Sequence, residues 1–261
     1  MKRTLAAVTA ALLMIGLVSS TALAGSGASI GGSAKAVYNA IPASVSANVP
    51  SLGFEATATN EFGDAVALGG SARSLQSMSV LLSSFACTTG HWDTVGGNCV
   101  TTPGATFPVP LTFTIYDFTG GTKGAQLAQQ TQIVNVLYRP SASSKCAGAD
   151  AGKWYNTSDK SCNNGLPQTF KMTFSGGTLT DQVVWTVAYS TSGFGPVPYG
   201  YGNACNSTAA GCPYDSLNVG AKSFEKAPYA GTDLDEDQAF RNGVMETGWT
   251  GFRPLGAITA K

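Results

Sequence analysis

Residues 169–189 read TFKMTFSGGTLTDQVVWTVAY, and this stretch decides the fold class. At 170–174, two phenylalanines and a methionine alternate with lysine and threonine, and at 183–189 valine, tryptophan and tyrosine alternate with smaller or more polar residues. A period of two residues is typical of a β-strand covered on one face. We therefore predict two strands here, joined as a hairpin through Gly176-Gly177.

Similar patterns recur along the chain. At 111–115, large apolar residues alternate with threonine, and Met78, Val80 and Leu82 follow the same pattern with serine until Leu81 breaks it. Residues 133–138 are almost continuously apolar and predict a central strand that ends before Pro140. At least seven such segments, separated by turns rich in Gly, Asn, Asp and Pro, predict an all-β fold with little helix. We expect an antiparallel, two-sheet β-sandwich, specifically a jelly roll.

The chain holds six cysteines, an even number that fall into three close pairs. The pairs that this spacing favours are Cys87–Cys99, Cys146–Cys162 and Cys205–Cys212. A metal site is the alternative, but zinc prefers C-x-x-C spacing and the chain has one histidine. Each pair lies in a long irregular stretch, where a disulfide would stabilise the fold by roughly 2–3 kcal/mol. The three predicted disulfide-closed loops are residues 86–108, 139–167 and 191–216.

The N-terminus has the composition of an export signal. A basic start at Lys2-Arg3 precedes an apolar run, and Ala22-Leu23-Ala24 supplies the small residues of a cleavage site. The apolar run is shorter than the roughly 20 residues that span a bilayer, which disfavours a retained anchor. We predict a signal peptide over 1–24, a flexible N-terminus over 25–35 and a single domain over 36–261, secreted and without a transmembrane segment after cleavage.

The charge balance argues against some partners. The full chain has 15 basic and 15 acidic residues, and removing Lys2 and Arg3 with the signal peptide leaves 13 and 15. Nucleic acids and anionic membranes bind clusters of Lys and Arg, and the sequence has no such cluster. We therefore expect no nucleic-acid partner.

No residue pattern predicts a catalytic site. His91 is the single histidine able to serve as a base, it lies between Cys87 and Cys99, and no G-x-S-x-G motif accompanies it. Glycoside hydrolysis needs two carboxylates across a cleft. Glu55 is the one acid well inside a predicted strand. We predict no catalytic residues, and a carbohydrate-active hydrolase stays as an alternative.

The densest acidic segment offers weak calcium ligands. Its alternate carboxylates belong to Asp233, Asp235 and Asp237, and carboxylate oxygens are the ligands that calcium prefers. The glycine and terminal glutamate of an EF-hand loop are absent, which favours a solvated acidic loop. We therefore predict no cofactor, with a structural calcium ion as the alternative.

Aromatic residues gather in the three cysteine-containing loops. Aromatic rings stack on the faces of sugars, and nearby polar groups fix the ligand's orientation. The predicted ligand-binding residues are Trp92, Trp154, Tyr155, Phe194, Tyr199, Tyr201 and Asn203. If the loops meet at one end of the sandwich, these rings form a surface for polysaccharide. The alternative is that they pack the loops onto the sheets, as we expect of Trp185 in the core and Trp249 near the last strand.

Four segments carry a resemblance to a known group of proteins. These segments are GFEA at 53–56, FGDAVALGGSAR at 62–73, YDSLNVG at 214–220 and WTGFRP at 249–254. Their sequence resembles that of exported bacterial β-sandwich proteins that are classified by their type of anchor. The resemblance implies a two-sheet extracellular fold and no reaction. Residues 247–261 show neither the hydrophobic stretch nor the sorting motif of anchored members, so we do not expect a surface anchor of that type.

Three functional hypotheses follow from these features. The first is a secreted, non-catalytic domain that binds extracellular polysaccharide or a cell-envelope component. The second is a carbohydrate-active hydrolase, which a close and shielded pair of carboxylates would favour. The third is a structural envelope protein, which a flat loop surface without exposed rings would favour.

Overall fold

A computed structural model describes residues 32–92, 97–191 and 213–261. These residues form β-strands and a single short 3₁₀ helix, η1 (Gly148–Asp150), and every strand pairing is antiparallel. The predicted all-β, antiparallel class is therefore confirmed. Within the same ranges, no helix is long and apolar enough to cross a membrane.

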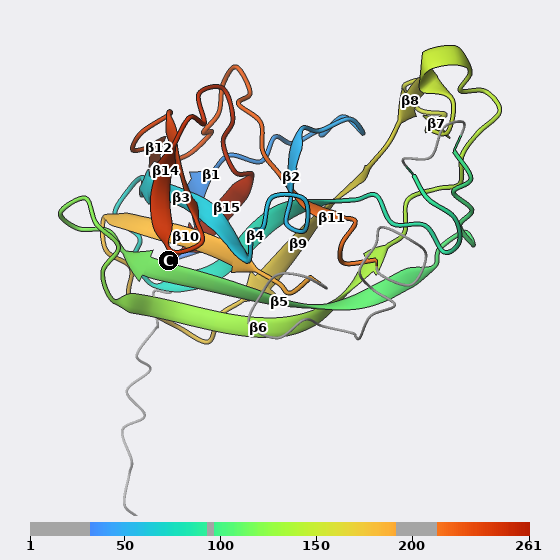
Figure 1. Cartoon of the computed structure of the whole chain (residues 1–261). Coiled ribbons are helices and arrows are strands. Elements are labelled where there is room, and N and C mark those ends of the chain that lie inside the picture. Colours follow the sequence, from blue (N-terminus) through green and yellow to red (C-terminus); the bar gives the residue numbers. More distant parts are fainter. Residues whose placement is uncertain (1–31, 93–96, 192–212) are drawn as a thin grey trace, which may run out of the picture. The chain divides into compact units, whose positions relative to one another are not determined.

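Two large sheets and one small sheet organise the strands (Figure 1). The six-stranded sheet contains β1 (Lys35–Asn39), β15 (Gly256–Ala260), β4 (Leu75–Ser84), β11 (Leu217–Gly220), β2 (Ser51–Gly53) and, on the other side of β4, β9 (Leu166–Thr173). The seven-stranded sheet contains β14 (Val244–Thr247), β13 (Gln238–Arg241), β12 (Thr232–Asp233), β3 (Glu61–Ala67), β10 (Gln182–Ala188), β5 (Thr106–Asp117) and β6 (Gln126–Leu137). The small sheet contains β7 (Trp154–Asn156) and β8 (Ser161–Asn163).

One hydrophobic core receives side chains from both large sheets. Met78 and Ile258 come from the six-stranded sheet, whereas Phe62, Phe113 and Trp185 come from the seven-stranded sheet, and all five are buried. Because strand side chains alternate between faces, each sheet needs apolar residues at every second position to supply this core. The alternation at 111–115 meets that requirement, whereas at 78–82 Leu81 breaks the alternation and is itself buried.

The predicted hairpin across Gly176-Gly177 is wrong. Residues 166–173 form β9, which pairs with β4, whereas 182–188 form β10, which pairs with β3 and β5 in the other sheet. The intervening segment therefore crosses between sheets instead of closing a turn between neighbouring strands. β10 is buried on both faces over most of its length, and it is a central strand that pairs with β3 from Gln182 to Ala188 and with β5 from Val183 to Ala188.

The apolar run at 133–138 is also placed differently from the prediction of a central strand. It lies in β6, which pairs with β5 alone and forms an edge of the seven-stranded sheet. Val136 is buried, but Ile133 and Leu137 on the opposite face are exposed. The run is continuous in sequence, but only alternate residues face the core.

Two prolines in β5 are compatible with its hydrogen bonding to the neighbouring strands. Pro108 and Pro110 lack an N–H group and therefore cannot donate a hydrogen bond to a neighbouring strand. Pairing of β5 with β10 stops at Thr112, so β10 does not extend along Pro108 and Pro110. The adjacent residues Phe107 and Val109 keep their register with β6. Both prolines therefore sit where β5 has one strand neighbour.

Two of the three predicted disulfides are confirmed, Cys87–Cys99 and Cys146–Cys162. The loop at 139–167 that holds the second is partly ordered by η1 and the β7–β8 pair. The third predicted pair, Cys205–Cys212, lies outside the described residues, as do the predicted signal peptide and residues 25–31 of the predicted flexible segment. β1 begins at Lys35, the last residue of that segment.

Candidate functional site

A ring-lined hollow of about 400 Å³ lies beside β2. Its lining residues are Pro50, Ser51, Leu52, Ala221, Gly248, Trp249 and Phe252. Phe252 is 47% exposed, and half-buried Trp249 packs on Phe62 with 5.0 Å between ring centroids. The Phe252 backbone N–H donates to the Trp249 carbonyl at 2.7 Å, so one tight turn presents both rings.

Two glycines allow the backbone to adopt this turn. Gly248 and Gly251 have φ angles of +94° and +83°, in a region where side-chain-bearing residues are strained. Gly248 directly precedes Trp249, and Gly251 directly precedes Phe252. The sequence GWTGF therefore forms a short turn that carries two aromatic rings at fixed positions.

A second hollow, of about 390 Å³, shares Pro50 and Ser51 with the first. The side chains that add hydrogen-bonding capacity are Asn48, Asn164 and Asn218. Asn218 Nδ2 donates to Ser51 Oγ at 3.1 Å, and Asn48 Nδ2 donates to the Cys162 carbonyl at 3.1 Å. These bonds orient two of the three amides, and within the described residues their carbonyl oxygens accept no hydrogen bond.

Two predicted ligand-binding residues lie close to this second hollow. Phe85 is in its lining, and Trp92 packs on Phe85 with 4.9 Å between ring centroids. Trp154 is buried, and its indole N–H donates to the carbonyl of Gly165, another lining residue, at 3.0 Å. Trp92 and Trp154 thus support the hollow from outside its lining.

The other predicted ligand-binding residues lie elsewhere. Tyr155 is half-buried in β7, with the Lys145 ammonium 4.9 Å from its ring centroid. Phe194, Tyr199, Tyr201 and Asn203 are outside the described residues. The structure therefore brings Trp92 and Trp154 to one region and leaves Tyr155 apart from the lining of either hollow.

The predicted calcium ligands are engaged in local hydrogen bonds. Asp233 Oδ1 accepts from the Asp235 backbone N–H at 3.0 Å, and Asp235 Oδ1 accepts from the Asp237 backbone N–H at 3.0 Å. Asp233 Oδ2 pairs with Arg253. Among residues 32–92, 97–191 and 213–261, no group of three or more His, Cys, Asp or Glu side chains is placed to hold a metal ion.

A buried polar cluster, formed by Tyr38, Asp64, Trp185, Asp233 and Arg253, was not predicted from the sequence. Arg253 Nε lies 2.7 Å from Asp233 Oδ2, and the two side chains are 3% and 4% exposed. Asp64 Oδ1 accepts from the Ala65 N–H at 2.9 Å. Within the described part of the chain, the second carboxyl oxygen of Asp64, the Tyr38 hydroxyl and the Trp185 indole N–H make no hydrogen bond of ordinary geometry.

Burial dominates the chemistry of this cluster. It raises the pKa of Asp64 well above its usual value, and the nearby charge of Asp233 raises it further. Burial also raises the pKa of Tyr38, with the charge of Asp64 acting in the same direction. Asp64 and Asp233 are a shielded carboxylate pair, but neither lines either hollow beside β2.

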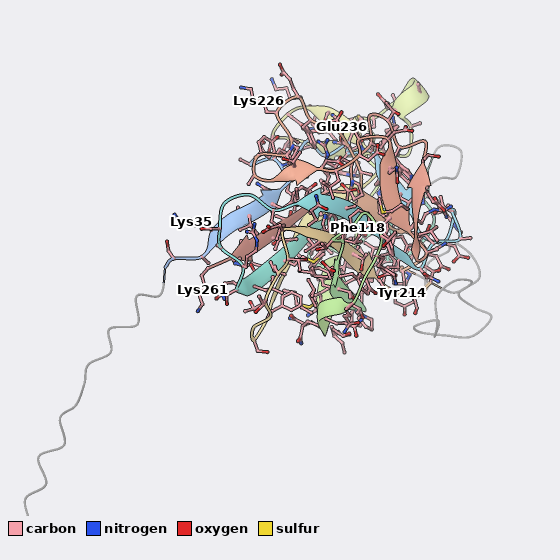
Figure 2. The ribbon with its side chains drawn as sticks, turned by 90° about the vertical axis from the view of Figure 1, so that its left-hand side faces the viewer. Lys35, Phe118, Tyr214, Lys226, Glu236 and Lys261 are labelled. Atoms are coloured by element: carbon pink, nitrogen blue, oxygen red, sulfur yellow. A yellow bond between two sulfur atoms is a disulfide. The ribbon has the colours of Figure 1, made fainter. Side chains whose placement is uncertain are left out.

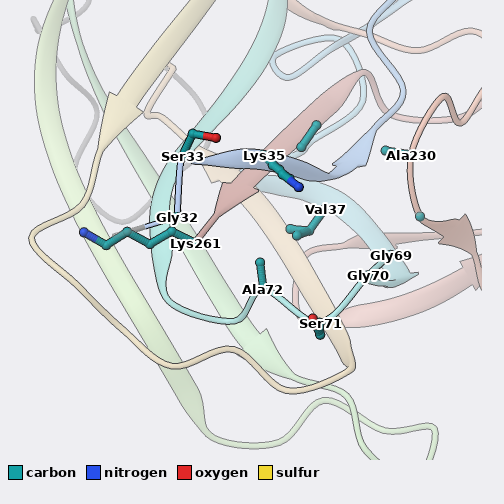
Figure 3. A pocket seen from close by; sticks show the side chains of 12 residues that line it. Gly32, Ser33, Lys35, Val37, Gly69, Gly70, Ser71, Ala72, Ala230 and Lys261 are labelled. Atoms are coloured by element: carbon teal, nitrogen blue, oxygen red, sulfur yellow. The ribbon is translucent and has the colours of Figure 1, made fainter. Parts of the chain in front are cut away.

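Two further hollows lie elsewhere on the described residues. One, of about 270 Å³, lies between Phe118 and Met245. The other, of about 630 Å³, is lined by glycines, small side chains and two lysines, Lys35 and Lys261, which lie close together at the start of β1 and the end of β15 (Figures 2 and 3). Neither Asp64 nor Asp233 lines these hollows, and the larger one has no aromatic side chain in its lining.

The raised pKa of Asp64 predicts a pH effect on stability. The folded protein holds a proton that an unfolded aspartate releases near pH 4, so this residue destabilises the fold as the pH rises from about 4 towards its raised pKa. Asp64→Asn cannot ionise and is expected to be at least as stable as the wild type at pH 7. Urea unfolding at pH 4 and pH 7 measures the difference.

The control for this experiment is Asp181→Asn, since Asp181 is exposed in its ion pair with Arg73. Its effect should be small at both pH values. The stability of Asp64→Asn relative to wild type should increase from pH 4 to pH 7. A relative decrease would mean that Asp64 is ionised in the folded protein and stabilises it as a carboxylate.

The two hollows that share Pro50 and Ser51 form the candidate binding site. One supplies flat apolar rings, and the other supplies amides with fixed orientation, which is the chemistry that a carbohydrate requires. The sequence signal for Trp249 and Phe252 was the pair of glycines around them, which sequence reasoning did not use. Comparison with protein-family models, with curated proteins and with solved structures finds no match to this chain.

Proposed function

We propose that the protein is a secreted, non-catalytic domain that binds extracellular or cell-envelope polysaccharide at the two hollows beside β2. The observation that carries this proposal is the exposed ring of Phe252 beside Trp249, next to a hollow lined by three asparagines. A sugar ring stacked on Phe252 and Trp249 would lie close to amides that can hydrogen-bond its hydroxyl groups.

The proposal includes an extracellular location and a two-sheet, jelly-roll-like sandwich. Two disulfides support an oxidising compartment, because such bonds are rare in the cytosol. The hydrophobic core shared by both large sheets supports the sandwich. The resemblance to exported β-sandwich proteins classified by anchor type agrees with both, and membership of that group is part of the proposal.

Binding is favoured over hydrolysis because of where the carboxylates lie. Asp64 and Asp233 are close enough for the charge of one to act on the pKa of the other, but both are buried and neither lines a described hollow. A hydrolase needs its two carboxylates on either side of the bond that it cleaves. The exposed ring of Phe252 disfavours the third hypothesis, a structural protein without a small ligand.

The first test measures binding of the purified, oxidised protein to an array of bacterial and plant polysaccharides, with release of reducing ends followed in the same wells. Phe252→Ala is expected to weaken binding at least about tenfold, since an aromatic anchor commonly contributes more than 1 kcal/mol. The matched control is Tyr229→Ala, which removes an aromatic ring of similar exposure, 45%, that lines neither hollow.

Each outcome of this test has one meaning. Binding without release, lost in Phe252→Ala and kept in Tyr229→Ala, supports the proposal. Release of reducing ends would identify a hydrolase instead. Equal loss in both variants, or no binding to any polysaccharide, would overturn the proposed site.

A further inference from the structure

Strand β6 leaves one side of its backbone open. It is the last strand of the seven-stranded sheet and pairs with β5 alone (Figure 1). Along most of its twelve residues the side chains are exposed on both faces. An edge strand of this length is a template for another strand, unless charges, prolines or bulges block it.

Two hydrogen bonds identify the residues whose backbone groups point to the open side. The Tyr138 N–H donates to the Ala105 carbonyl in the direction of β5, whereas the Leu137 N–H donates to Oε1 of Gln168 at 2.9 Å. Gln168 Nε2 also donates to the Leu137 carbonyl at 3.1 Å. In an antiparallel ladder, both backbone groups of a residue point the same way and neighbours alternate. From Gln129 to Leu137, the odd-numbered residues therefore direct their backbone N–H and C=O groups to the open side.

The outward residues before Leu137 are Gln129, Thr131, Ile133 and Asn135. Their N–H groups have no partner within the described residues, and the one hydrogen bond to their carbonyls is a long contact from Gln130 Nε2 to Thr131 at 3.4 Å. The Gln168 side chain already occupies the end of the edge at Leu137. An open segment of seven residues, 129–135, remains.

This segment lacks the usual protection of an edge strand. Residues 126–137 read QLAQQTQIVNVL, with no charged residue and no proline, and the single irregularity in the register with β5 lies before residue 129. On the outward-facing residues, Ile133 is 62% exposed, the highest value among the exposed large hydrophobic side chains of the described residues. The open segment therefore offers backbone groups and an apolar side chain without a repelling charge.

We propose that the open segment of β6 pairs antiparallel with the same segment of a second copy of this chain. A two-fold axis at Gln132 places Gln129 opposite the partner's Asn135 and Thr131 opposite the partner's Ile133. This register uses all four outward residues on each copy, and each opposing pair exchanges both of its hydrogen bonds. The two Ile133 side chains then become diagonal neighbours on one face.

The charge balance favours a second copy over a charged partner strand. The open segment is neutral, and the chain has 15 basic and 15 acidic residues, or 13 and 15 without residues 1–24, so two copies approach without strong repulsion. The outward residues also match one another under two-fold symmetry, which is the requirement of a closed dimer. The open segment therefore satisfies both conditions, the absence of charge repulsion and the two-fold match, without a rearrangement of the sheet.

Sedimentation velocity of the oxidised protein over roughly 1 µM to 1 mM tests this pairing. The wild type is expected to show a concentration-dependent dimer. Ile133→Pro removes an N–H that points to the open side and has no partner inside the monomer, so the fold should persist while the dimer weakens at least tenfold. Ile133→Thr is the matched control, since it removes apolar surface, keeps the N–H and should weaken the dimer less.

A second variant tests the pairing independently, in case Ile133→Pro does not fold. Thr131→Lys places two like charges at diagonal positions of the paired edge, and its exposed position should leave the monomer intact. Circular dichroism and the thermal midpoint check the fold of each variant. A monomeric wild type at every concentration would overturn the proposal, and so would a dimer that survives both Ile133→Pro and Thr131→Lys.

Discussion

Replacing Arg253 with methionine is expected to lower the free energy of unfolding by about 3–5 kcal/mol, because the change leaves a buried carboxylate without its partner. The Arg253 and Asp233 side chains are 3% and 4% exposed, so water cannot replace the lost ion pair. Arg253 Nη1 also donates to the Ala227 carbonyl at 2.8 Å, and that acceptor would lose this bond. Urea unfolding of the oxidised protein at pH 7 measures the loss.

Arg241→Met is the matched control for this substitution. Arg241 pairs with Glu246 at the same 2.7 Å, but the two side chains are 25% and 29% exposed. Solvent weakens the pair and rehydrates the remaining carboxylate, so a loss of about 1 kcal/mol is expected. If Arg253→Met loses no more than Arg241→Met, the Arg253–Asp233 pair is not shielded from water in solution.

Local patterns in the sequence predicted the class of the fold. A period of two residues depends on the residues of one strand alone, so the alternation at 111–115 is sufficient to predict a strand there. Cysteine spacing is also local, and it correctly predicted Cys87–Cys99 and Cys146–Cys162. These predictions needed no knowledge of which strands are neighbours.

Strand pairing could not be read in the same way. Residues 166–173 and 182–188 are close in sequence, but the first pairs with residues 77–84 and the second with 61–67 and 112–117. Which strands become neighbours depends on how side chains from distant parts of the chain pack in the assembled core. The sequence of one strand does not contain that information. The apolar run at 133–138 was misplaced for the same reason.

The candidate site could not be predicted from the sequence for a different reason. Phe252 and Trp249 come from a turn near the C-terminus, whereas Leu52 and Asn48 come from the segment around β2. Single aromatic residues are common on protein surfaces, so neither ring stood out in the sequence. Likewise, Asp233 is one member of an acidic run, and nothing in that run distinguishes the carboxylate that pairs with Arg253.

Replacing Gly63 with alanine is expected to lower the free energy of unfolding by about 3 kcal/mol or more, because the added carbon overlaps the backbone of the neighbouring strand. A Cβ atom at Gly63 would overlap the Trp185 carbonyl oxygen and lie 2.7 Å from its carbonyl carbon. Both are main-chain atoms, so a rotamer change cannot relieve the overlap. Differential scanning calorimetry should show a thermal midpoint lowered by roughly 6–12 °C.

Gly32→Ala separates this steric effect from the general effect of replacing glycine. A Cβ atom at Gly32 would meet nothing within 4 Å, so this variant should stay within about 0.5 kcal/mol of the wild type. Gly63 lies on β3 opposite Thr186 of β10, and β10 is held on its other side by β5. Moving β10 away from an alanine would therefore disturb three adjacent strands. Equal stability of the two variants would mean that β3 and β10 are not in this register.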